Sequence, residues 1–334
     1  MQTYNWGVLG PGSIANTFAE AMKLSGRGKI TAVASRSLER ARVFADKYQI
    51  STVYSDYKAL LNDANVDIIY IATPHSFHFE QAKLCLEAGK HVLVEKPCTV
   101  SAEQMQYLVE LAEANNVLLQ EGVWSRFMPV LSQVKSLIQE GAISDIQYIQ
   151  SNIGFAFQNR AEPKQRLARP ELAGGALLDL GIYSITLSQF FLEQHPSSIT
   201  SQGKLTDLGV DECELVNLSY STGQYAQFTS SMSAHASNTM HIVGSQGYVI
   251  LPHNFWDADR AYFYEHDKCV QTIEIPHAAN GFEYEIEEVM NCIEQGKLCS
   301  DLMSHKDSIS VLQVMDEIRS QLGVKYPDNI IQAG

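Results

Sequence analysis

Three residues that can move or stabilise a proton stand at positions that a fold could bring together. Lys96 follows His91–Val94, a short apolar run typical of a strand. Asp179 and Tyr183 are four residues apart in an apolar stretch, and this spacing places two side chains on one face of an α-helix. A phenol with an unperturbed pKa of about 10 is a weak base at neutral pH, but a neighbouring ammonium group stabilises its phenolate. The three residues therefore suit acid/base chemistry on a hydroxyl or carbonyl group.

A glycine-rich turn near the N-terminus has the spacing of a phosphate-binding turn. Gly10–Ala15 reads G-P-G-S-I-A directly after an expected strand. Gly10 allows the tight turn, Gly12 leaves room for a pyrophosphate, and a small residue at Ala15 lets the following helix lie against the strand. The helix N-terminus then offers free N–H groups to phosphate oxygens. We expect a dinucleotide here, held by Gly10, Gly12, Ser13 and Ile14.

The end of the second expected strand indicates which dinucleotide. The chain reads Ala34-Ser35-Arg36-Ser37, without the acidic residue that accepts from the ribose hydroxyls of NAD. Ser35 can donate to a 2′-phosphate, and Arg36 with Arg40 can pair with it or stack on the adenine. One charged hydrogen bond contributes about 1.5–3 kcal/mol, so we expect a roughly tenfold to hundredfold preference for NADP. NAD is the alternative cofactor, and solvated helix charges are the alternative interpretation of the two arginines.

The first 120 residues alternate short β-branched runs with amphipathic stretches, as βαβ units do. Strands are expected at Asn5–Leu9, Ile30–Ser35, Ile68–Ala72, His91–Val94 and Val117–Gln120. Helices are expected at Ile14–Leu24, Leu38–Tyr48, Phe77–Ala88 and Ala102–Ala114, with Ser37 and Ser101 as N-caps. The pattern predicts an α/β chain whose residues 1–121 form a Rossmann domain with a doubly wound parallel sheet.

The rhythm changes in residues 122–334, which we expect to form a C-terminal α+β domain on a largely antiparallel, open-faced sheet. Helices are expected at Pro129–Glu140, Ala176–Phe191, Glu283–Gln295 and Lys306–Leu322. Strands are expected at Ile146–Phe157, Glu214–Tyr220, Tyr225–Met232, Thr239–Val243 and Tyr248–Leu251, the last four among several in the region from Ser197 to Ile275.

The length, charge and composition of the chain indicate which classes of partner it can bind. A chain of 334 residues suits two domains, and its net charge of −14 without a basic run disfavours nucleic acid. The longest apolar runs, such as Ile68–Ala72, are far shorter than a membrane span, and the N-terminal residues do not resemble an export signal. Six scattered cysteines without a C-x-x-C pair indicate reduced, structural thiols. We expect a cytoplasmic protein with small-molecule partners, and no membrane or nucleic-acid partner.

Taken together, the motifs resemble the Gfo/Idh/MocA oxidoreductase family, which groups glucose-fructose oxidoreductase, inositol dehydrogenase and their relatives. The turn at Gly10–Ala15, Ala72-Thr73-Pro74 with His78 beyond it, and Glu95-Lys96-Pro97 all match at the family's spacing. The resemblance covers nearly the whole chain. It implies that Thr73, Pro74, His78, Glu95 and Lys96 bind the cofactor, with His78 beside the nicotinamide.

One departure from the family pattern points to a branch. Asp179-Leu180-Gly181-Ile182-Tyr183 is similar to the family's D-x-G-x-H segment, with Tyr183 in place of the commoner histidine. This form resembles the branch with dimeric dihydrodiol dehydrogenase and NADP-dependent xylose dehydrogenase. Trp124–Phe127, Phe255-Trp256 and Gly281–Glu285 resemble the same branch. The resemblance implies NADP as cofactor and a homodimer paired through the open face of the second sheet.

These residues predict a hydride transfer between NADP(H) and a hydroxyl or carbonyl group. Tyr183 is the expected acid/base, Lys96 polarises the reacting oxygen, and Asp179 orients the substrate; Lys96 is the alternative proton acceptor. An apolar pocket for a sugar-like substrate or a cyclic diol is expected from Trp124, Arg126, Phe127, Phe155, Asp179 and Phe282, with Trp256 beside them. Core packing is the alternative role for some of the aromatic residues.

Two other interpretations, a metal site and a non-catalytic role, bear on the function. His75 and His78 match a metal-binding pattern, but no cysteine or carboxylate completes a ligand set nearby, so no metal is expected. The alternative function is a non-catalytic dinucleotide sensor, because the family includes a transcriptional repressor. The presence of Lys96, Asp179 and Tyr183 favours the enzyme.

Overall fold

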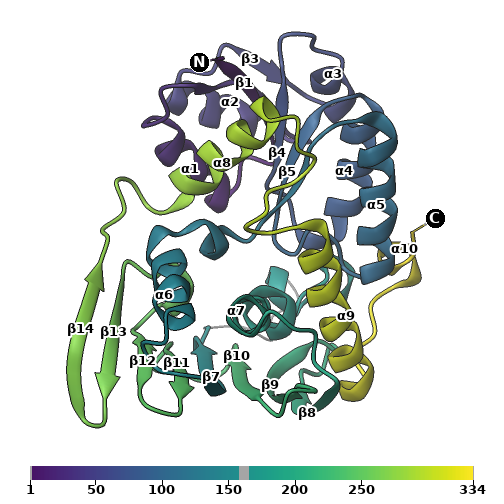
Figure 1. The fold of residues 1–334 in the computed structure, drawn as a ribbon. Helices are drawn as coiled ribbons and strands as arrows, with labels where there is room; N and C mark the ends of the chain where they lie inside the picture. Colours follow the sequence, from purple (N-terminus) through teal and green to yellow (C-terminus); the bar gives the residue numbers. More distant parts are fainter. Residues whose placement is uncertain (1, 158–164, 334) are drawn as a thin grey trace. The chain divides into compact units, whose positions relative to one another are not determined.

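The computed structural model describes residues 2–157 and 165–333. Internal contacts divide them into two compact units, shown as a ribbon in Figure 1. The first unit contains residues 2–124, 277–308 and 333. The second contains the described residues of 125–276 together with 309–332. The contacts therefore assign residues 277–308 to the first unit, whereas the sequence placed all of 122–334 in one domain.

The first unit is built on a six-stranded sheet with the order β3-β2-β1-β4-β5-β6, in which every neighbouring pair is parallel. Its strands are β1 (Tyr4–Leu9), β2 (Gly28–Ala34), β3 (Thr52–Tyr54), β4 (Ile68–Ile71), β5 (His91–Glu95) and β6 (Leu119–Gly122). Its main helices are α1 (Ser13–Met22), α2 (Leu38–Tyr48), α3 (Tyr57–Leu61), α4 (His78–Glu87), α5 (Ala102–Asn115) and α8 (Phe282–Glu294). The expected doubly wound parallel fold is confirmed.

Local signals explain why the expected helices form where they do. Ser37 and Ser101 accept hydrogen bonds from the backbone N–H groups of Arg40 and Gln104, so both expected N-caps are present. The sequence pattern does not predict the short β3 and α3. Each residue of β3 is only half-buried, and a three-residue strand carries too little alternation to stand out.

Helix α8 is held in the first unit by ion pairs to one arginine and by its apolar face. Arg27 precedes β2 and its side chain is 11% exposed. Its guanidinium pairs with Glu287 at 2.8 Å and with Glu294 at 3.1 Å, both on α8. Phe282 and Ile286 of the same helix lie in the core formed by β1 and α1. In Figure 1, α1 and α8 lie on one side of the sheet, while α4 and α5 lie on the other.

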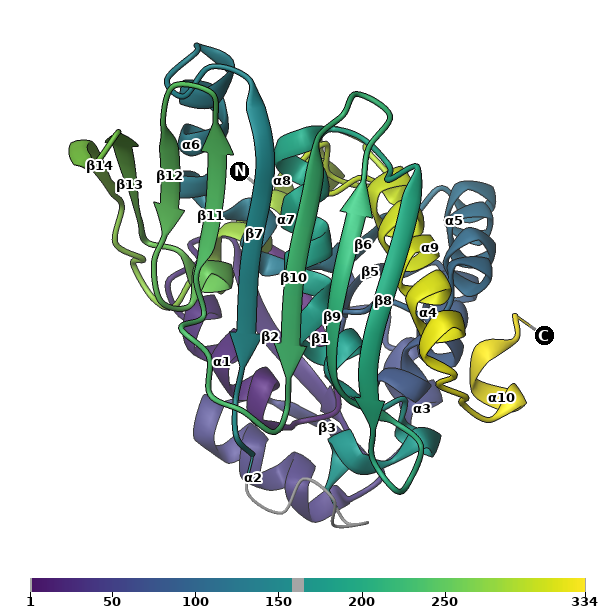
Figure 2. The same ribbon diagram turned by 90° about the horizontal axis from the view of Figure 1, so that it is seen from below.

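The second unit is built on an eight-stranded sheet with the order β14-β13-β12-β11-β7-β10-β9-β8. Only the β7–β10 pair is parallel among its described neighbours, so the largely antiparallel sheet is confirmed. The strands are β7 (Ile146–Gly154), β8 (Ser198–Leu205), β9 (Asp211–Ser219), β10 (Tyr225–Ser231), β11 (Met240–Gly244), β12 (Tyr248–Leu251), β13 (Arg260–Glu265) and β14 (Lys268–Glu274). Figure 2 shows the strands in front, with α6 (Pro129–Gln139), α7 (Ile182–Leu192) and part of α9 (His305–Leu322) behind them.

The segment that carries Asp179 and Tyr183 is not the uniform α-helix expected from the sequence. Leu177–Gly181, η5, forms a π-helical turn, and α7 follows it. The four-residue spacing of an α-helix therefore does not apply across this segment, because a π-helical turn contains an additional residue. Single-turn π-bulges of this kind occur frequently at functional sites.

Apolar length alone would also allow this segment to cross a membrane, contrary to the expectation that no run is long enough. Pro170–Leu192 contains a window of sufficient hydropathy, but 94% of that window is buried inside the structure. Every residue of α7 is buried, so the helix has no polar face to reveal its helical period. This is the environment of a core helix.

Candidate active site

The glycine turn lies at the carboxyl edge of the first sheet, where open α/β sheets bind ligands. Gly10 follows β1 with φ +86°, a conformation that favours glycine. A Cβ at Gly10 would lie 2.6 Å from Thr73 Cγ2, so the position excludes a side chain for a second reason. The Gly10 N–H donates to the Ala34 carbonyl at 3.2 Å, which ties the turn to the end of β2.

The start of α1 fits the phosphates of a dinucleotide. Gly12 is the N-cap of the helix and makes no side-chain capping bond, so the first-turn N–H groups remain available to a ligand. A Cβ at Gly12 would meet no atom closer than 4.0 Å, which leaves the space that a pyrophosphate needs. Ser13 and Ile14 are exposed beside it. The residues of this turn therefore fit the group expected from the sequence.

The end of β2 supplies the expected cation. The Arg36 guanidinium lies 4.8 Å from the centre of the Phe77 ring, which places it beside the end of β4. Ser35 is buried, and its hydroxyl accepts from the Ser37 N–H at 3.1 Å. Arg40 is exposed on the first turn of α2. No carboxylate follows β2 directly.

His78 connects the two loops that follow β4 and β5. Its side chain is fully buried, with Nε2 at 2.7 Å from the Thr73 carbonyl oxygen and Nδ1 at 2.8 Å from that of Pro97. Carbonyl oxygens only accept hydrogen bonds, so both contacts are made when both ring nitrogens carry a proton. The Thr73 hydroxyl donates to Gln81 at 2.7 Å, and Pro74 caps the short helix that follows.

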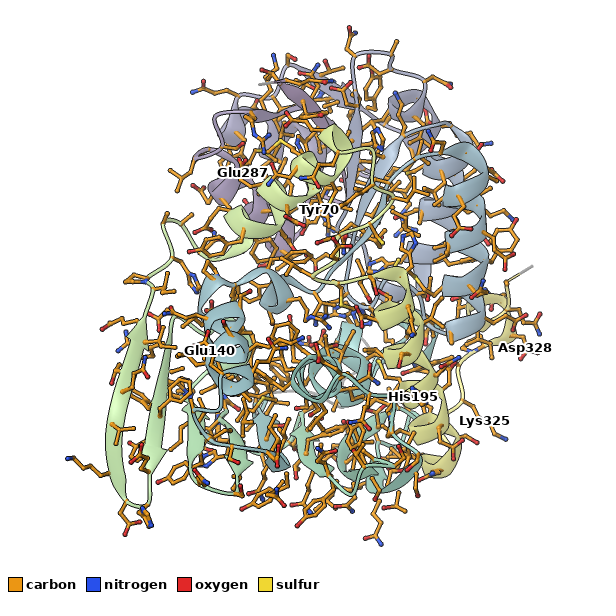
Figure 3. The ribbon with its side chains drawn as sticks, viewed as in Figure 1. Tyr70, Glu140, His195, Glu287, Lys325 and Asp328 are labelled. Atoms are coloured by element: carbon orange, nitrogen blue, oxygen red, sulfur yellow. The ribbon has the colours of Figure 1, made fainter. Side chains whose placement is uncertain are left out.

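Lys96 comes directly after β5 and follows a buried acid, Glu95. The Glu95 carboxylate accepts from the Tyr70 hydroxyl at 2.5 Å, and Figure 3 labels Tyr70 within the first unit. Lys96 itself is half-buried, and its peptide bond to Pro97 is cis. The two residues next to Lys96 in the chain are therefore each held by a hydrogen bond, Glu95 by that from Tyr70 and Pro97 by that with His78.

Two further acids in this region were not expected from the sequence. Glu121 on β6 is 1% exposed and accepts from the Cys98 N–H at 2.8 Å. Glu285 on α8 is fully buried, and neither carboxyl oxygen has a hydrogen-bond partner among the described residues. Burial raises the pKa of Glu285 well above its usual range, and the negative charge of Glu95 raises it further. Such a carboxyl group favours its neutral form.

The cysteine near this loop is structural in character. Cys98 is fully buried, and burial raises the pKa of its thiol, with Glu121 adding to the effect. A high pKa keeps the thiol protonated and unreactive. All six cysteines are free thiols in the structure.

In the second unit, Asp179 lies in the π-helical turn η5 and has an ionic partner. The Arg166 guanidinium contacts its carboxylate at 2.9 Å, and the Asp179 side chain remains 15% exposed. Arg166 was not expected as a site residue, because it lies in a polar loop without a recognisable motif. The ion pair orients the Asp179 carboxylate.

Tyr183 stands among aromatic rings on the first turn of α7. Its ring lies 6.1 Å from that of Trp256, with the planes 30° apart. Phe155 contacts the same Trp256 edge to face at 5.7 Å. Trp256 and Phe155 are half-buried, so the cluster is partly open to solvent. Phe155 and Trp256 are two of the expected pocket residues, and their role toward a substrate stays a prediction.

The remaining expected pocket residues are divided between the units. Trp124 and Phe282 contact each other at 4.8 Å in the first unit. In the second unit, the Arg126 guanidinium lies 4.7 Å from the Phe190 ring, and Phe127 is 4% exposed. Phe127 and Phe282 are packed as core residues are, while Trp124 is half-buried. Their role toward a substrate stays a prediction.

The structure thus gathers the expected cofactor residues in the first unit and Asp179 with Tyr183 in the second.

The two histidines that match a metal-binding pattern, His75 and His78, have their rings 5.8 Å apart. Within residues 2–157 and 165–333, no group of three or more His, Cys, Asp or Glu side chains is placed to hold a metal ion.

Both halves of the chain match family models. Residues 4–123 match an oxidoreductase family with an NAD-binding Rossmann fold. Residues 131–250 match the GFO/IDH/MocA C-terminal domain.

Relatives of known activity match the whole chain. Trans-1,2-dihydrobenzene-1,2-diol dehydrogenase of Xenopus tropicalis is 34% identical over 333 residues, which cover 96% of this chain and 99% of the relative. The enzyme of the same name from Mus musculus is 32% identical and covers 97% and 98%. Relatives of this identity and coverage show common descent over both units.

Solved structures share the fold. A 3-ketoreductase from Actinomadura kijaniata, in complex with NADP and TDP-benzene, is 25% identical with a TM-score of 0.87, covering 96% of this chain and 98% of that one. An aldose-aldose oxidoreductase from Caulobacter crescentus, complexed with glycerol, is 21% identical with a TM-score of 0.87, covering 96% and 97%.

Proposed function

Because this chain belongs to the Gfo/Idh/MocA oxidoreductase family, we propose that it transfers a hydride between NADP(H) and a hydroxyl or carbonyl group of a sugar-like or cyclic diol substrate. The chain is an NAD(P)-binding oxidoreductase of this family. The preference for NADP and the roles of Lys96, Tyr183 and Asp179 are the proposed part.

A continuous series of contacts along the carboxyl edge of the first sheet carries the proposal. The turn at Gly10 bonds to the end of β2 and packs on Thr73. His78 bonds to the Thr73 carbonyl and, on its other side, to that of Pro97, next to Lys96. The phosphate turn, the nicotinamide end and the amine thus share one edge, as a dinucleotide with a reactive end requires.

The protein's own groups supply binding and proton transfer. When bound, the nicotinamide accepts or donates the hydride. The Lys96 ammonium stabilises negative charge on the reacting oxygen, and the Tyr183 phenol takes its proton during oxidation and returns it during reduction. Asp179, held by Arg166, binds a second hydroxyl and sets the orientation of the substrate.

The aromatic cluster supports a ring-shaped substrate. Flat faces of Tyr183, Trp256 and Phe155 suit the apolar face of a sugar or a cyclic diol, while the charged Asp179 suits a vicinal hydroxyl. The names of the relatives agree with both classes, since they act on a dihydrodiol or an aldose. A compound with two adjacent hydroxyls on a ring is the best first substrate.

An absorbance assay tests the function directly. The protein is mixed with NADP⁺ and a panel of aldoses and trans-dihydrodiols, and formation of the reduced cofactor is followed. We expect turnover with at least one ring compound that carries adjacent hydroxyls. Tight NADP binding without turnover of any member would instead favour the non-catalytic sensor.

Arg36→Ala should weaken NADP binding without affecting NAD. Loss of one charged hydrogen bond costs about 1.5–3 kcal/mol, so we expect the Kd for NADP to rise about tenfold to a hundredfold. NAD lacks the 2′-phosphate and should bind as before. Calorimetric titration with both cofactors measures the difference.

The matched control is Arg42→Ala, an exposed arginine on α2 away from the end of β2. Its loss should leave both affinities unchanged. An equal loss of NADP and NAD affinity in Arg36→Ala would mean that Arg36 does not recognise the 2′-phosphate.

We further propose a cytoplasmic homodimer, paired through the second sheet. Ser151 on β7 bonds to Ser184 on α7, so alternate residues such as Tyr148 point to the opposite face. On that face Tyr148 stacks on Tyr225 at 5.6 Å, and Tyr248 stacks on Tyr264 at 4.8 Å. Tyrosine pairs of this kind are enriched at interfaces. Six free thiols suit the reducing cytoplasm.

Tyr225→Glu should convert the dimer into a monomer, because it places a charge in the aromatic face. Light scattering after size-exclusion chromatography should show a mass near 37.2 kDa in place of twice that value. The control is Leu24→Glu, which changes an exposed apolar residue of the first unit. A wild-type mass for Tyr225→Glu would place the interface elsewhere or show that the protein is a monomer.

A further inference from the structure

Two buried carboxyl groups support the π-helical turn η5 that carries Asp179. Asp211 and Glu214 both lie on β9 and are 0% and 1% exposed. Asp211 Oδ2 accepts a hydrogen bond of 2.6 Å from the backbone N–H of Leu177, the first residue of the turn. Free N–H groups at the start of a helical segment need such an acceptor. Here the acceptor is the buried carboxylate of Asp211, which comes from β9 and not from the helical segment itself.

Glycines at both ends of the turn allow the two acids to approach. Gly175 has φ +115°, and a Cβ there would overlap Asp211 Oδ1. At the other end, a Cβ on Gly181 would lie 3.2 Å from Glu214 Oε1 and 3.0 Å from the Ser230 hydroxyl. The turn therefore rests on Asp211 at its start and on Glu214 at its end. Tyr183 follows two residues later.

The two acids differ in their charge. Burial raises the pKa of Asp211 to about 6, although backbone N–H groups, first that of Leu177, oppose the shift. Burial raises the pKa of Glu214 well above its usual range, and the Asp211 charge raises it further. The Ser230 hydroxyl opposes the shift of Glu214, but no backbone N–H of the described residues does. The proton therefore resides on Glu214 and the negative charge on Asp211 near neutral pH.

Other titratable or charged groups surround the pair. Arg319 on α9 lowers the pKa of Asp211, and its guanidinium lies 5.2 Å from the Tyr326 ring. The Tyr326 hydroxyl donates to the Gly174 carbonyl, just before the turn. Two neighbouring residues of β9 are also titratable: Glu212 pairs with Lys204 at 2.7 Å, and Cys213 is partly exposed. Among the described residues, Arg319 is thus the cation that acts on Asp211.

We propose that ionised Asp211 and protonated Glu214 are positioning residues, which hold the π-helical turn in the conformation where Asp179 and Tyr183 act on the substrate. Protonation of Asp211 removes the charged acceptor from the start of the turn and lowers activity. The inference rests on the proposed roles of Asp179 and Tyr183, and it adds an acid-sensitive support beneath them.

Asp211→Asn and Glu214→Gln form a matched pair of isosteric variants. The asparagine cannot present a charged carboxylate to the N–H of Leu177, so the turn should shift slightly. Small displacements of reacting groups lower the rate strongly, and we expect kcat to fall about tenfold to a hundredfold. The glutamine imitates the neutral form that Glu214 already adopts, and its kcat should stay within about twofold of wild type. The KM for NADP should not change in either variant.

The pH profile separates positioning from simple loss of structure. In the reduction direction Tyr183 must be protonated, so protonation of Tyr183 itself leaves the acid side flat. Wild type and Glu214→Gln should lose kcat below a pH near 6, where Asp211 takes up its proton. Asp211→Asn should lack this transition. An acid limb that persists unchanged in the asparagine variant overturns the proposal.

A second measurement needs no substrate. Trp256 lies 6.1 Å from Tyr183, so a fluorine label on its indole reports the position of the phenol. With 5-fluorotryptophan and a Trp256→Phe spectrum for assignment, the Trp256 resonance should shift near pH 6 in wild type and remain constant in Asp211→Asn. A wild-type resonance that does not titrate overturns the coupling, even if the asparagine variant does not fold. A titrating resonance without turnover of any substrate supports the coupling and contradicts the proposed function.

Discussion

Lys96→Met should reduce kcat by about 10³-fold or more while NADP still binds. A positioned charge that stabilises a developing oxyanion contributes about 2.7–4 kcal/mol in a water-excluded site, and each 1.36 kcal/mol corresponds to a factor of ten. Lys96 also stabilises the phenolate of Tyr183 in the proposed mechanism, so its loss affects both the oxygen and the base. Methionine retains the length and flexibility of the side chain but not its charge. Stopped-flow or steady-state absorbance gives kcat, and fluorescence titration gives the Kd for NADP.

Two variants define what the Lys96 result means. Lys58→Met removes an exposed cation from α3 of the same unit and should leave turnover unchanged. Lys96→Arg restores the charge but not the compact ammonium, so it should recover only part of the rate. A rate for Lys96→Met close to wild type, with the controls as expected, would remove the amine from the mechanism.

Tyr183→Phe should lower kcat by about 10²–10⁴-fold, the usual contribution of a positioned general acid or base. The change removes one hydroxyl and keeps the ring that contacts Trp256, so the aromatic cluster should remain intact. The dinucleotide turn belongs to the first unit and Tyr183 to the second. The Kd for NADP should therefore be unchanged, and the loss should appear in kcat with either a sugar or a diol.

The control for Tyr183→Phe is Tyr264→Phe, a stacked tyrosine on the outer face of the second sheet. It should be as active as wild type. If Tyr183→Phe retains full turnover while Lys96→Met is inactive, Lys96 is the proton acceptor and Tyr183 only packs against the substrate.

The sequence was most informative where a local motif and its fold coincide. Helix α2 begins and ends as expected because Ser37 caps it and Leu38 starts a clear amphipathic period. The Gly10 turn lies at the predicted strand end because few other residues adopt its backbone conformation. Lys96, Thr73 and His78 share one sheet edge because parallel strands end on the same side.

Features that depend on burial could not be predicted in the same way. Glu214 and Glu285 read as ordinary surface charges, since only the fold shows that water is excluded from them. The π-helical turn at Leu177–Gly181 has the composition of an α-helix, and the side chain that accepts from its first N–H comes from Asp211, 34 residues away. Arg27 holding α8 to the first unit is likewise a contact between distant parts of the chain.

The attachment of α8 to the first unit has a consequence for biosynthesis. Phe282 and Ile286 complete the core around Trp6 and Phe18, yet the ribosome makes them after nearly all of the second unit. Domains usually fold in order as they emerge, N-terminal first. Here the nascent cofactor-binding unit must wait, with part of its core uncovered, until residues 282–294 have left the ribosome. A chain truncated at residue 124 would retain the phosphate turn but lack the helix that closes the hydrophobic core behind it.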